Sequence, residues 1–503
     1  MILARWLRRI ARAHPDLPAV AIGDRVHLTY HQFAERAARV AGWLRAEGAR
    51  PGDRIAIVSE NRPEYLEALC GTWWAGCAAA PIDARTRGVE LRRLLENADA
   101  AIILVGSKAA TEVAAQAPET TRRLVRFGGA EFARSESADP IELSDGDPEM
   151  MAWLSYTAGR GGVSKGAMLS HRALASMTVS MLAEVNSVVP RDAQIQSAPL
   201  SDAAGFSILP AIARGGVNVT PESAGFDEAE AFELAAAWRR ASILVCPWAL
   251  RQMTRSGADD DPSAFKSIIA TGDAMHGRDA VEALDRFGPR LAQIYGEAEF
   301  PMTIARLSKH DVADRGHERW RDKLASVGRP FLEADVSIRR ADGDPTEADE
   351  IGEICVRGPA QMTGYWRAPA ETRAAIDRGW LRTGDLGVFD ALGYLRLVGR
   401  RDEVAQVGGE EVHPRAVEAA LLEHPEVEQA AVRADGAGGL DAFVVGAAGA
   451  RALRAHCDAR LPDHARPSRI TLLDDLPRGC NGAVLKDRIK PPTRTRAGRR
   501  KAG

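Results

Sequence analysis

The chain lacks any long apolar segment. No uninterrupted apolar run in its 503 residues approaches the roughly 20 residues that a membrane-spanning helix requires. The N-terminal stretch places Leu3, Leu7 and Ile10 at helical spacing, but arginines interrupt it before the apolar core of a signal peptide can form. We therefore expect no transmembrane segment, a cytoplasmic location, and an amphipathic N-terminal helix that docks on the rest of the protein.

Clustered cysteines and an excess of one charge are also missing. The six cysteines are scattered, without a CxxC pair or a Cys–His cluster, which disfavours a zinc site or a disulfide framework. The formal net charge of −3 gives no bias toward nucleic acid or an anionic membrane. What remains is a globular composition, with 45% hydrophobic and 27% charged residues. We expect no nucleic-acid partner, and the sequence does not indicate an oligomeric state.

From about residue 28 the chain alternates between helix-like and strand-like segments. The helix-like segment that begins at the N-cap residue Thr29 ends at Gly48. Its apolar face is formed by Phe33, Ala37, Val40 and Leu44. Strand-like runs occupy 54–60, 100–105, 242–247, 267–271 and 292–296. The alternation predicts an α/β fold with parallel-rich sheets, in which ligands bind at the carboxyl ends of strands.

The pattern changes near residue 398. A short helix is expected over 414–424, strands over 427–433 and 440–446, and a second helix from about 449 to 460. This predicts a large N-terminal domain (1–398) followed by a small mobile α+β domain (399–490), with a hinge near 399–403. The basic end, 491–503, is expected to be disordered.

A glycine-rich loop stands out in the middle of the large domain. Residues 156–171 read YTAGRGGVSKGAMLSH and contain a single lysine, Lys165. Glycine N–H groups can converge on an anion, and a lysine adds positive charge beside it. A Walker A loop is excluded, since Ser164 stands where its last glycine should be and Gly166 follows the lysine. Spacing alone leaves a phosphate loop and a flexible turn equally open.

A series of ordered motifs resolves this ambiguity. The glycine loop resembles Y-T-S-G-S/T-T-G-x-P-K-G, the signature of the adenylate-forming superfamily, which includes acyl-CoA synthetases, peptide adenylation domains and luciferases. Further similar segments are APLSDAAG (198–205), TGDAM (271–275), IYGEAEF (294–300), GEICVRGPAQMTGYW (352–366), WLRTGDLG (380–387) and GRRDEVAQVGGEEVHPRAVE (399–418). The resemblance covers nearly the whole chain.

The resemblance implies a two-step reaction. A carboxylate attacks the α-phosphate of ATP to give acyl-AMP and pyrophosphate, the small domain rotates, and a thiol then accepts the acyl group. ATP, Mg²⁺ and CoA are the implied cofactors, and a small carboxylic acid of the fatty, aryl or alicyclic class is the implied substrate. A carrier-protein thiol stays open as an alternative acceptor to CoA.

The resemblance also implies site residues, position by position. Tyr295 would stack on adenine, Asp385 would accept hydrogen bonds from the ribose hydroxyls, and Arg400 would support the ribose or phosphate side. The full set implied for the nucleotide is Thr157, Gly159, Lys165, Gly272, Asp273, Ala274, Tyr295, Gly296, Asp385 and Arg400. A core position for Tyr295 stays open as an alternative.

Other residues are matched to the metal, the hinge and the acyl group. Glu299 would bind Mg²⁺, a hard cation that prefers carboxylate oxygen. Asp402 falls in the hinge, where an ordinary exposed charge is an alternative, and Gly408 and Gly409 would line the thiol tunnel. The candidates for the acyl pocket are Asp202, Phe206 and Trp248.

The sequence departs from the family mainly where phosphate is handled. The lysine that the family carries near its C-terminus is Ala483 here. Loss of one preorganised charge at a transition state costs about 3 to 4 kcal/mol, or roughly a hundredfold to a thousandfold in rate. Lys486, three residues further on, is a candidate substitute, since it would lie one helical turn away if that stretch is helical.

The remaining departures from the family motifs also fall at positions that handle phosphate or an anionic substrate. In the glycine loop, Ala158, Arg160 and Gly161 stand where the family has hydroxyl residues. Ala298 replaces a threonine, and Asp202 replaces a histidine. We expect an acid–thiol ligase whose adenylation step is impaired. The alternatives are a pseudoenzyme that binds nucleotide or acyl-adenylate, and an enzyme that retains only the thioester-forming half-reaction.

Overall fold

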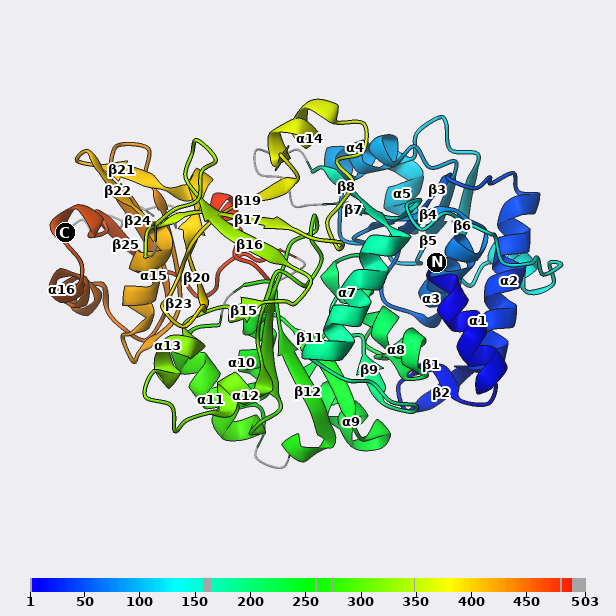
Figure 1. Ribbon diagram of the computed structural model, residues 1–503, viewed down its shortest axis with the longest axis horizontal. Helices are drawn as coiled ribbons and strands as arrows, with labels where there is room; N and C mark the ends of the chain where they lie inside the picture. The colour runs from blue at the N-terminus through cyan, green and yellow to red at the C-terminus, as the bar shows by residue number, and fades with distance from the viewer. Residues whose placement is uncertain are drawn as a thin grey trace, which may run out of the picture. The chain divides into compact units, whose positions relative to one another are not determined.

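The computed structural model describes residues 2–156, 164–257, 260–273, 275–347, 349–479 and 482–490. The chain divides into two compact units, each with its own sheets and helices (Figure 1). The large unit comprises Met1–Leu397 with Cys480–Gly482, and the small unit comprises Val398–Gly479 with Ala483–Gly503. The stretch 491–503, expected from its composition to be disordered, lies outside the described residues.

The first sheet of the large unit contains six described strands in the order β6-β5-β3-β4-β7-β8. Neighbouring strands run parallel except β7 and β8, which are antiparallel. Their bounds are β3 (Arg54–Val58), β4 (Ala78–Ile82), β5 (Ile102–Val105), β6 (Arg123–Arg126), β7 (Met151–Tyr156) and β8 (Gly166–Ser170). Strands β4 and β5 are buried along their whole length, as apolar strands in a sheet with both faces covered should be.

The second sheet contains nine described strands in the order β15-β14-β13-β12-β11-β9-β10-β1-β2. The six central strands are parallel, and antiparallel strands are added at both ends. Their bounds are β1 (Pro18–Ile22), β2 (Arg25–Thr29), β9 (Ala193–Ile195), β10 (Val217–Thr220), β11 (Ala241–Val245), β12 (Phe265–Ala270), β13 (Leu291–Tyr295), β14 (Ala305–Leu307) and β15 (Arg329–Pro330). The predicted α/β fold with parallel-rich sheets is confirmed.

The N-terminal helices form as their sequences predict. Helix α2 (Tyr30–Ala46) starts with a capping box, in which Thr29 and Gln32 each accept a hydrogen bond from the other's backbone N–H. Helix α1 (Ala4–Ala13) buries Trp6, Leu7 and Ile10 and packs against α2 and α8 (Ile208–Arg214). The amphipathic N-terminal segment is thus a docking helix that turns its apolar face inward.

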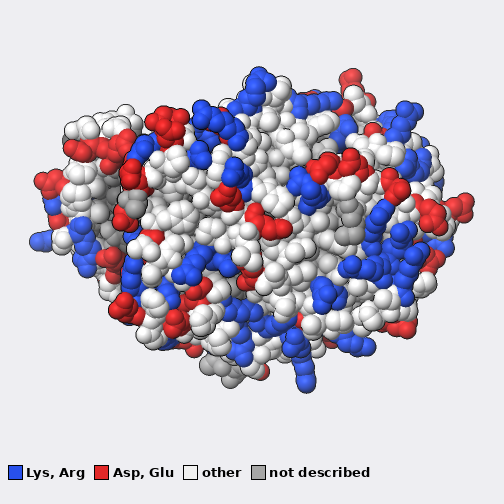
Figure 2. All heavy atoms as spheres, viewed as in Figure 1, with Lys and Arg blue, Asp and Glu red and all other residues white. Residues whose placement is uncertain are grey.

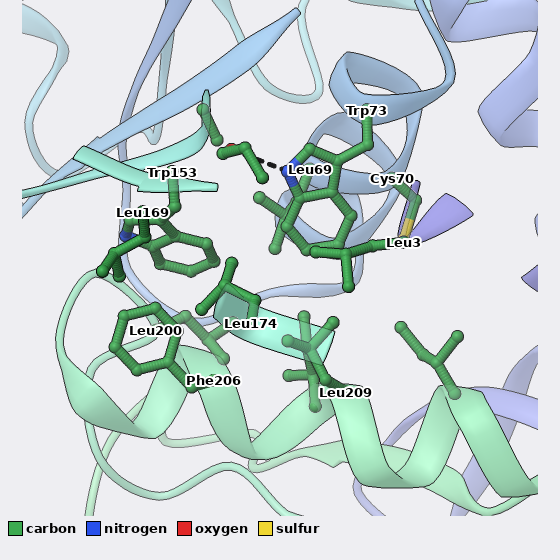
Figure 3. Packing of buried hydrophobic residues seen from close by; sticks show 14 of the residues in the cluster. Leu3, Leu69, Cys70, Trp73, Trp153, Leu169, Leu174, Leu200, Phe206 and Leu209 are labelled. Carbon is green, nitrogen blue, oxygen red and sulfur yellow. Dashed lines mark hydrogen bonds between the residues drawn. The ribbon is translucent and has the colours of Figure 1, made fainter. Parts of the chain in front are cut away.

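Two tryptophans, Trp73 and Trp153, pack with Phe206 between the first sheet and its neighbouring helices (Figure 3). Trp73, on α3 (Pro63–Trp74), donates from Nε1 to the carbonyl of Ala152 at 2.8 Å. Its ring centroid lies 6.2 Å from that of Trp153, which in turn lies 4.8 Å from that of Phe206. These large rings fill the core between β7 and the turn that leads into α8.

A third sheet in the large unit was not evident from the sequence. It pairs β16-β17-β19-β18 in antiparallel fashion, with β20 against β19. The bounds are β16 (Asp335–Arg339), β17 (Gly352–Arg357), β18 (Ile376–Asp377), β19 (Trp380–Phe389) and β20 (Leu395–Arg400). The boundary between the two units falls within β20. The motif segment 380–387 lies on β19, and the segment 352–366 begins on β17 and then leaves this sheet.

The small unit has the predicted α+β composition. Its three-stranded sheet pairs β23 antiparallel and β25 parallel to β24, and a short hairpin is formed by β21 and β22. The bounds are β21 (Ala405–Val407), β22 (Glu410–Val412), α15 (Pro414–Leu422), β23 (Val427–Ala434), β24 (Leu440–Gly446), α16 (Ala450–Arg460) and β25 (Arg469–Leu472). Strand β25 was not predicted.

The surface carries both charges. Lys and Arg side chains and Asp and Glu side chains are both scattered over the face shown in Figure 2. Across the described ranges, no helix is both long and apolar enough to cross a membrane. The described cysteines, Cys70, Cys77, Cys246, Cys355 and Cys457, are free thiols.

Candidate active site

A tyrosine–aspartate pair lies at the carboxyl end of β13. The Tyr295 hydroxyl donates to Oδ2 of Asp385, on β19, over 2.8 Å. Both residues are 9% exposed, so a small part of each remains accessible. Burial raises the pKa of the Tyr295 hydroxyl well above its ordinary value, and the charge of Asp385 adds to this effect. The hydroxyl therefore stays protonated at neutral pH and donates to the carboxylate.

The backbone around Asp385 is held by its neighbours. Its N–H donates to Oγ1 of Thr383 at 3.1 Å, and that hydroxyl donates to the carbonyl of Ile354 at 2.8 Å. The N–H of Gly384 donates to the buried carboxylate of Glu353, which also pairs with Arg382. The segment 383–385 is therefore held against β17 up to the aspartate.

The loop after β12 approaches the same edge of the sheet. Strands β12 and β13 are adjacent and parallel, so Gly272 and Asp273, which follow β12, lie at the edge where Tyr295 ends β13. The N–H of Met275 donates to Oε1 of Gln293 at 3.1 Å and ties this loop to β13. Ala274, also predicted for this loop, lies outside the described residues.

The turn after β13 places Glu299. A Cβ on Gly296 would lie 2.5 Å from the backbone nitrogen of Met302, so only glycine fits at the start of this turn. Oε1 of Glu299 accepts a 2.6 Å hydrogen bond from the hydroxyl of Tyr365. The ammonium of Lys165 lies 5.0 Å from the centroid of the same tyrosine ring. The predicted metal ligand and the lysine of the glycine loop therefore meet at one residue that the sequence interpretation had not assigned.

Tyr365 was not singled out, although it stands in the matched segment 352–366. The signal was its place in that motif next to Gly364, but a tyrosine hydroxyl has no obvious role until its partner is known. The other glycine-loop predictions, Thr157 and Gly159 together with the altered positions Ala158, Arg160 and Gly161, lie outside the described residues.

Two of the three acyl-pocket candidates, Asp202 and Phe206, lie in or next to the turn before α8, and Trp248 lies on another helix. Phe206 is 2% exposed and stacks in the core against Trp153 (Figure 3). Trp248 belongs to a different apolar cluster and packs against Phe226, with ring centroids 5.7 Å apart. Asp202 is partly exposed in the turn before α8. Phe206 is therefore a core residue of the large unit.

In the small unit, the predicted glycine pair forms the turn of a hairpin. Gly408 and Gly409 join β21 to β22, and both have positive φ, 62° and 90°. A two-residue turn with positive φ at both positions matches the twist of the flanking strands and favours glycine. Arg400 and Asp402 lie at the start of the unit, with Nε of the arginine 3.5 Å from Oδ1 of the aspartate.

Ala483 lies in a tight backbone pairing of the small unit. The N–H of Gly479 donates to its carbonyl at 2.9 Å, and the N–H of Leu485 donates to the carbonyl of Pro477 at 2.8 Å. Arg478 and Val484 form an antiparallel bridge. This stretch is extended, so Lys486 is not one helical turn from Ala483.

Lys486 has partners within the small unit. Its ammonium lies 2.7 Å from Glu418 and 3.0 Å from Glu403. Burial alone would lower the pKa of Lys486, but the charges of the two glutamates outweigh it and raise that pKa. In this arrangement the lysine links α15 to Glu403, near the start of the small unit.

No group of three or more His, Cys, Asp or Glu residues able to hold a metal occurs in the part of the chain that the structure describes. In nucleotide-binding enzymes the substrate itself can supply ligands to a cation. Mg²⁺ in phosphoryl-transfer sites is commonly held in this way, by one or two carboxylates and by substrate phosphates.

Comparisons with known proteins cover both units. The family described as AMP-binding enzyme matches residues 7–366, and the AMP-binding enzyme C-terminal domain matches residues 416–483. Feruloyl-CoA synthase from an Amycolatopsis species is 32% identical, over 97% of this chain and 98% of the relative. A 2-succinylbenzoate–CoA ligase from Geobacillus kaustophilus is 30% identical, over 97% of this chain and 97% of the relative.

A solved structure is similar over the same extent. The o-succinylbenzoate CoA synthetase from Bacillus subtilis, in complex with its acyl-adenylate intermediate, superposes with a TM-score of 0.85. It is 25% identical, and the match covers 97% of this chain and 98% of that chain.

Proposed function

Because the chain belongs to the acyl-CoA synthetase family of the adenylate-forming superfamily, we propose that it converts a carboxylic acid to a CoA thioester through acyl-AMP. The observation that carries this proposal is the Tyr295–Asp385 pair at the carboxyl end of β13, on the edge that the Gly272–Asp273 loop also reaches. Nucleotides bind at this edge of open α/β sheets.

The acid is proposed to be an aryl, fatty or alicyclic one, with aryl acids to be tested first. The names of the two relatives refer to ferulate and 2-succinylbenzoate, which are both aryl acids. CoA is the proposed acceptor for the same reason, and a carrier-protein thiol is the alternative acceptor.

The nucleotide would be held mainly by the large unit. Asp385 accepts from Tyr295 and would also accept hydrogen bonds from the ribose hydroxyls, since a carboxylate can accept several. The accessible part of the Tyr295 ring would contact adenine, with the loop at Gly272 and Asp273 beside it. Arg400 is proposed, from the family resemblance alone, to support the ribose or phosphate side.

Glu299 fits a role in binding Mg²⁺, because its carboxylate is already oriented by the Tyr365 hydroxyl. The cation would supply neutralisation of the phosphate charges. Lys165 would add a positive charge from the end of the glycine loop, held over the Tyr365 ring.

In the proposed first step, a carboxylate oxygen of the acid bonds to the α-phosphorus of ATP and the bond to pyrophosphate breaks. In the second step, the CoA sulfur bonds to the acyl carbon, AMP leaves, and the thiol proton is released. Ala483 brings no charge to the first step, so we propose that adenylation is slower than in relatives that carry the lysine, by roughly a hundredfold to a thousandfold.

The same residue favours a second candidate function. A chain without this lysine would bind nucleotide or acyl-adenylate without making it, or would perform only the thioester-forming half-reaction. This candidate rests on Ala483 and on the altered glycine loop.

Carboxylate-dependent ATP–pyrophosphate exchange separates the candidates. The full-length protein is incubated with labelled pyrophosphate, MgATP and a panel of aryl, fatty and alicyclic acids, and in parallel with synthetic acyl-AMP and CoA. Exchange above background with any acid supports the ligase and excludes the pseudoenzyme. Thioester formation from acyl-AMP without exchange supports the half-reaction alone, and the absence of both excludes the ligase.

A further inference from the structure

Residues 362–366 act as a backbone strap between the glycine-loop strand and the turn that carries Glu299. The N–H of Met362 donates to the carbonyl of Glu299 at 2.8 Å. On the other side, Thr363 N–H donates to Met168 O, Met168 N–H to Gly364 O, and Trp366 N–H to Gly166 O, at 2.8 to 2.9 Å. The strap therefore pairs with β8, which begins directly after Lys165.

The side chain at the centre of this strap touches both charged groups. Tyr365 is 8% exposed; its hydroxyl donates to Oε1 of Glu299 at 2.6 Å, and its ring lies under the Lys165 ammonium at 5.0 Å. Its own N–H donates to Oγ1 of Thr372 at 2.8 Å. Backbone and side-chain contacts together leave the tyrosine little freedom to move.

The geometry points to Tyr365 as a positioning residue that sets the Glu299 carboxylate for the divalent cation and the Lys165 ammonium for the phosphates of ATP. This inference rests on the proposed function of the site as one for MgATP. Tyr365 itself touches neither the reacting carboxylate nor the phosphorus, and it acts through its two charged neighbours.

The two contacts have different chemistry and can be separated. A hydroxyl on Oε1 fixes the rotation of the carboxylate and hence the direction of Oε2, as outer-shell donors do for metal-binding carboxylates. The aromatic face attracts the ammonium through its quadrupole, and this attraction does not depend on the hydroxyl. Phenylalanine at 365 would lose the first contact and keep the second, whereas leucine would lose both.

The positioning of Lys165 by Tyr365 matters more in this chain than in a relative whose glycine loop has the usual hydroxyl residues. Ala158, Arg160 and Gly161 stand where hydroxyl donors to the phosphates are typical of the family, and Lys165 is retained. The placement of that one lysine then matters more for phosphate binding.

The test is equilibrium binding of ATP to the full-length protein by calorimetry, with and without Mg²⁺, for wild type, Tyr365→Phe and Tyr365→Leu. We expect Tyr365→Phe to bind ATP as wild type does without Mg²⁺, while its apparent affinity for Mg²⁺ at saturating ATP falls about tenfold. Tyr365→Leu should in addition bind metal-free ATP about two- to fivefold more weakly.

Tyr394→Phe is the matched control. The Tyr394 hydroxyl also donates a 2.6 Å hydrogen bond to a carboxylate, that of Asp311, outside the motif segments. Its loss should lower thermal stability without changing the Mg²⁺ dependence of ATP binding. An equal loss of Mg²⁺ affinity in Tyr394→Phe would trace the effect to stability and overturn the inference.

The outcomes distinguish this inference from the proposed function. If the wild-type protein binds no ATP, with or without Mg²⁺, both the proposed function and this inference are wrong. Wild-type protein that binds MgATP, together with a Tyr365→Phe variant of unchanged Mg²⁺ affinity, would overturn the positioning role alone.

Discussion

The hydroxyl of Tyr295 donates a 2.8 Å hydrogen bond to Asp385, a residue 90 positions further along the chain. Tyr295 ends a parallel strand of the nine-stranded sheet, and Asp385 lies within the antiparallel sheet of β16 to β20. The bond therefore joins two of the matched segments, 294–300 and 380–387, at the proposed nucleotide site.

Replacing Tyr295 by Phe would keep the ring and remove the donor. Asp385, largely buried, would lose a hydrogen-bond partner, which costs about 1 to 3 kcal/mol of unfolding free energy. Because the carboxylate would also lose its orientation, we expect AMP affinity by calorimetry to fall about tenfold, or about 1.4 kcal/mol. Tyr394→Phe should lose comparable stability and retain AMP affinity. Unchanged AMP binding in Tyr295→Phe would contradict the assigned role of the pair.

Restoring the family lysine by Ala483→Lys would return a positive charge to the adenylation step. We expect ATP–pyrophosphate exchange to rise by roughly a hundredfold to a thousandfold with an acid that the protein accepts. Ala483→Met, which has a long side chain without charge, should give no gain. If the lysine variant also gains nothing with a known substrate, charge at position 483 is not what limits adenylation.

The variant Lys486→Met would leave Glu403 and Glu418 without their shared cation. Removing one partner of a largely buried ion pair destabilises proteins by about 3 to 5 kcal/mol, and we expect the small unit to melt earlier in calorimetry of the full-length protein. Lys490→Met, at an exposed position of the same segment, should leave the melting unchanged. Loss of pyrophosphate exchange with unaltered melting would instead assign Lys486 to catalysis.

Acid should destabilise the protein through His171. Its Nδ1 accepts from the N–H of Leu3 at 3.3 Å, and burial lowers the pKa of the imidazole to about 4 from 6.5. The unfolded chain binds this proton first, so the stabilisation is complete above pH 6.5 and is lost as the pH falls toward 4.

The expected loss is about 2.4 kcal/mol at pH 4.5 relative to pH 7, measured by urea unfolding. His171→Asn keeps an acceptor near Nδ1 and removes the titrating group, so its stability should depend less on pH by that amount. His31→Asn, at an exposed position, is the control. Equal pH dependence of wild type and His171→Asn would show that His171 does not titrate as described.

Local elements of the fold were predictable because their signals are local. The Thr29 cap, the apolar face that begins at Phe33 and the stop at Gly48 all lie within one helix, and α2 forms over those residues. The strand-like runs of the large unit likewise became β3, β5, β11, β12 and β13. The antiparallel sheet of β16 to β20 escaped prediction because β16 and β20 are only partly buried, and because buried and partly buried positions alternate along β19 without a continuous apolar run.

The candidate site was predicted in part. Motif order named Tyr295, Asp385 and Glu299 from the sequence, but gave no indication that the first two are bonded to each other. Tyr365 was overlooked because its role depends on a partner in another motif. The sequence also did not predict the extended backbone at Ala483. Nor did it predict that Lys486 pairs with Glu403 and Glu418.

The sequence by itself determined the α/β fold class, the family, and the loss of the lysine at position 483, because periodicity, caps and motif spacing are properties of short stretches of chain. Only the tertiary structure decided which of these residues act on one another. Whether Tyr365 meets Glu299 and Lys165 depends on how strap 362–366 pairs with β8. That pairing is a contact between segments far apart in the chain, and no local pattern encodes it.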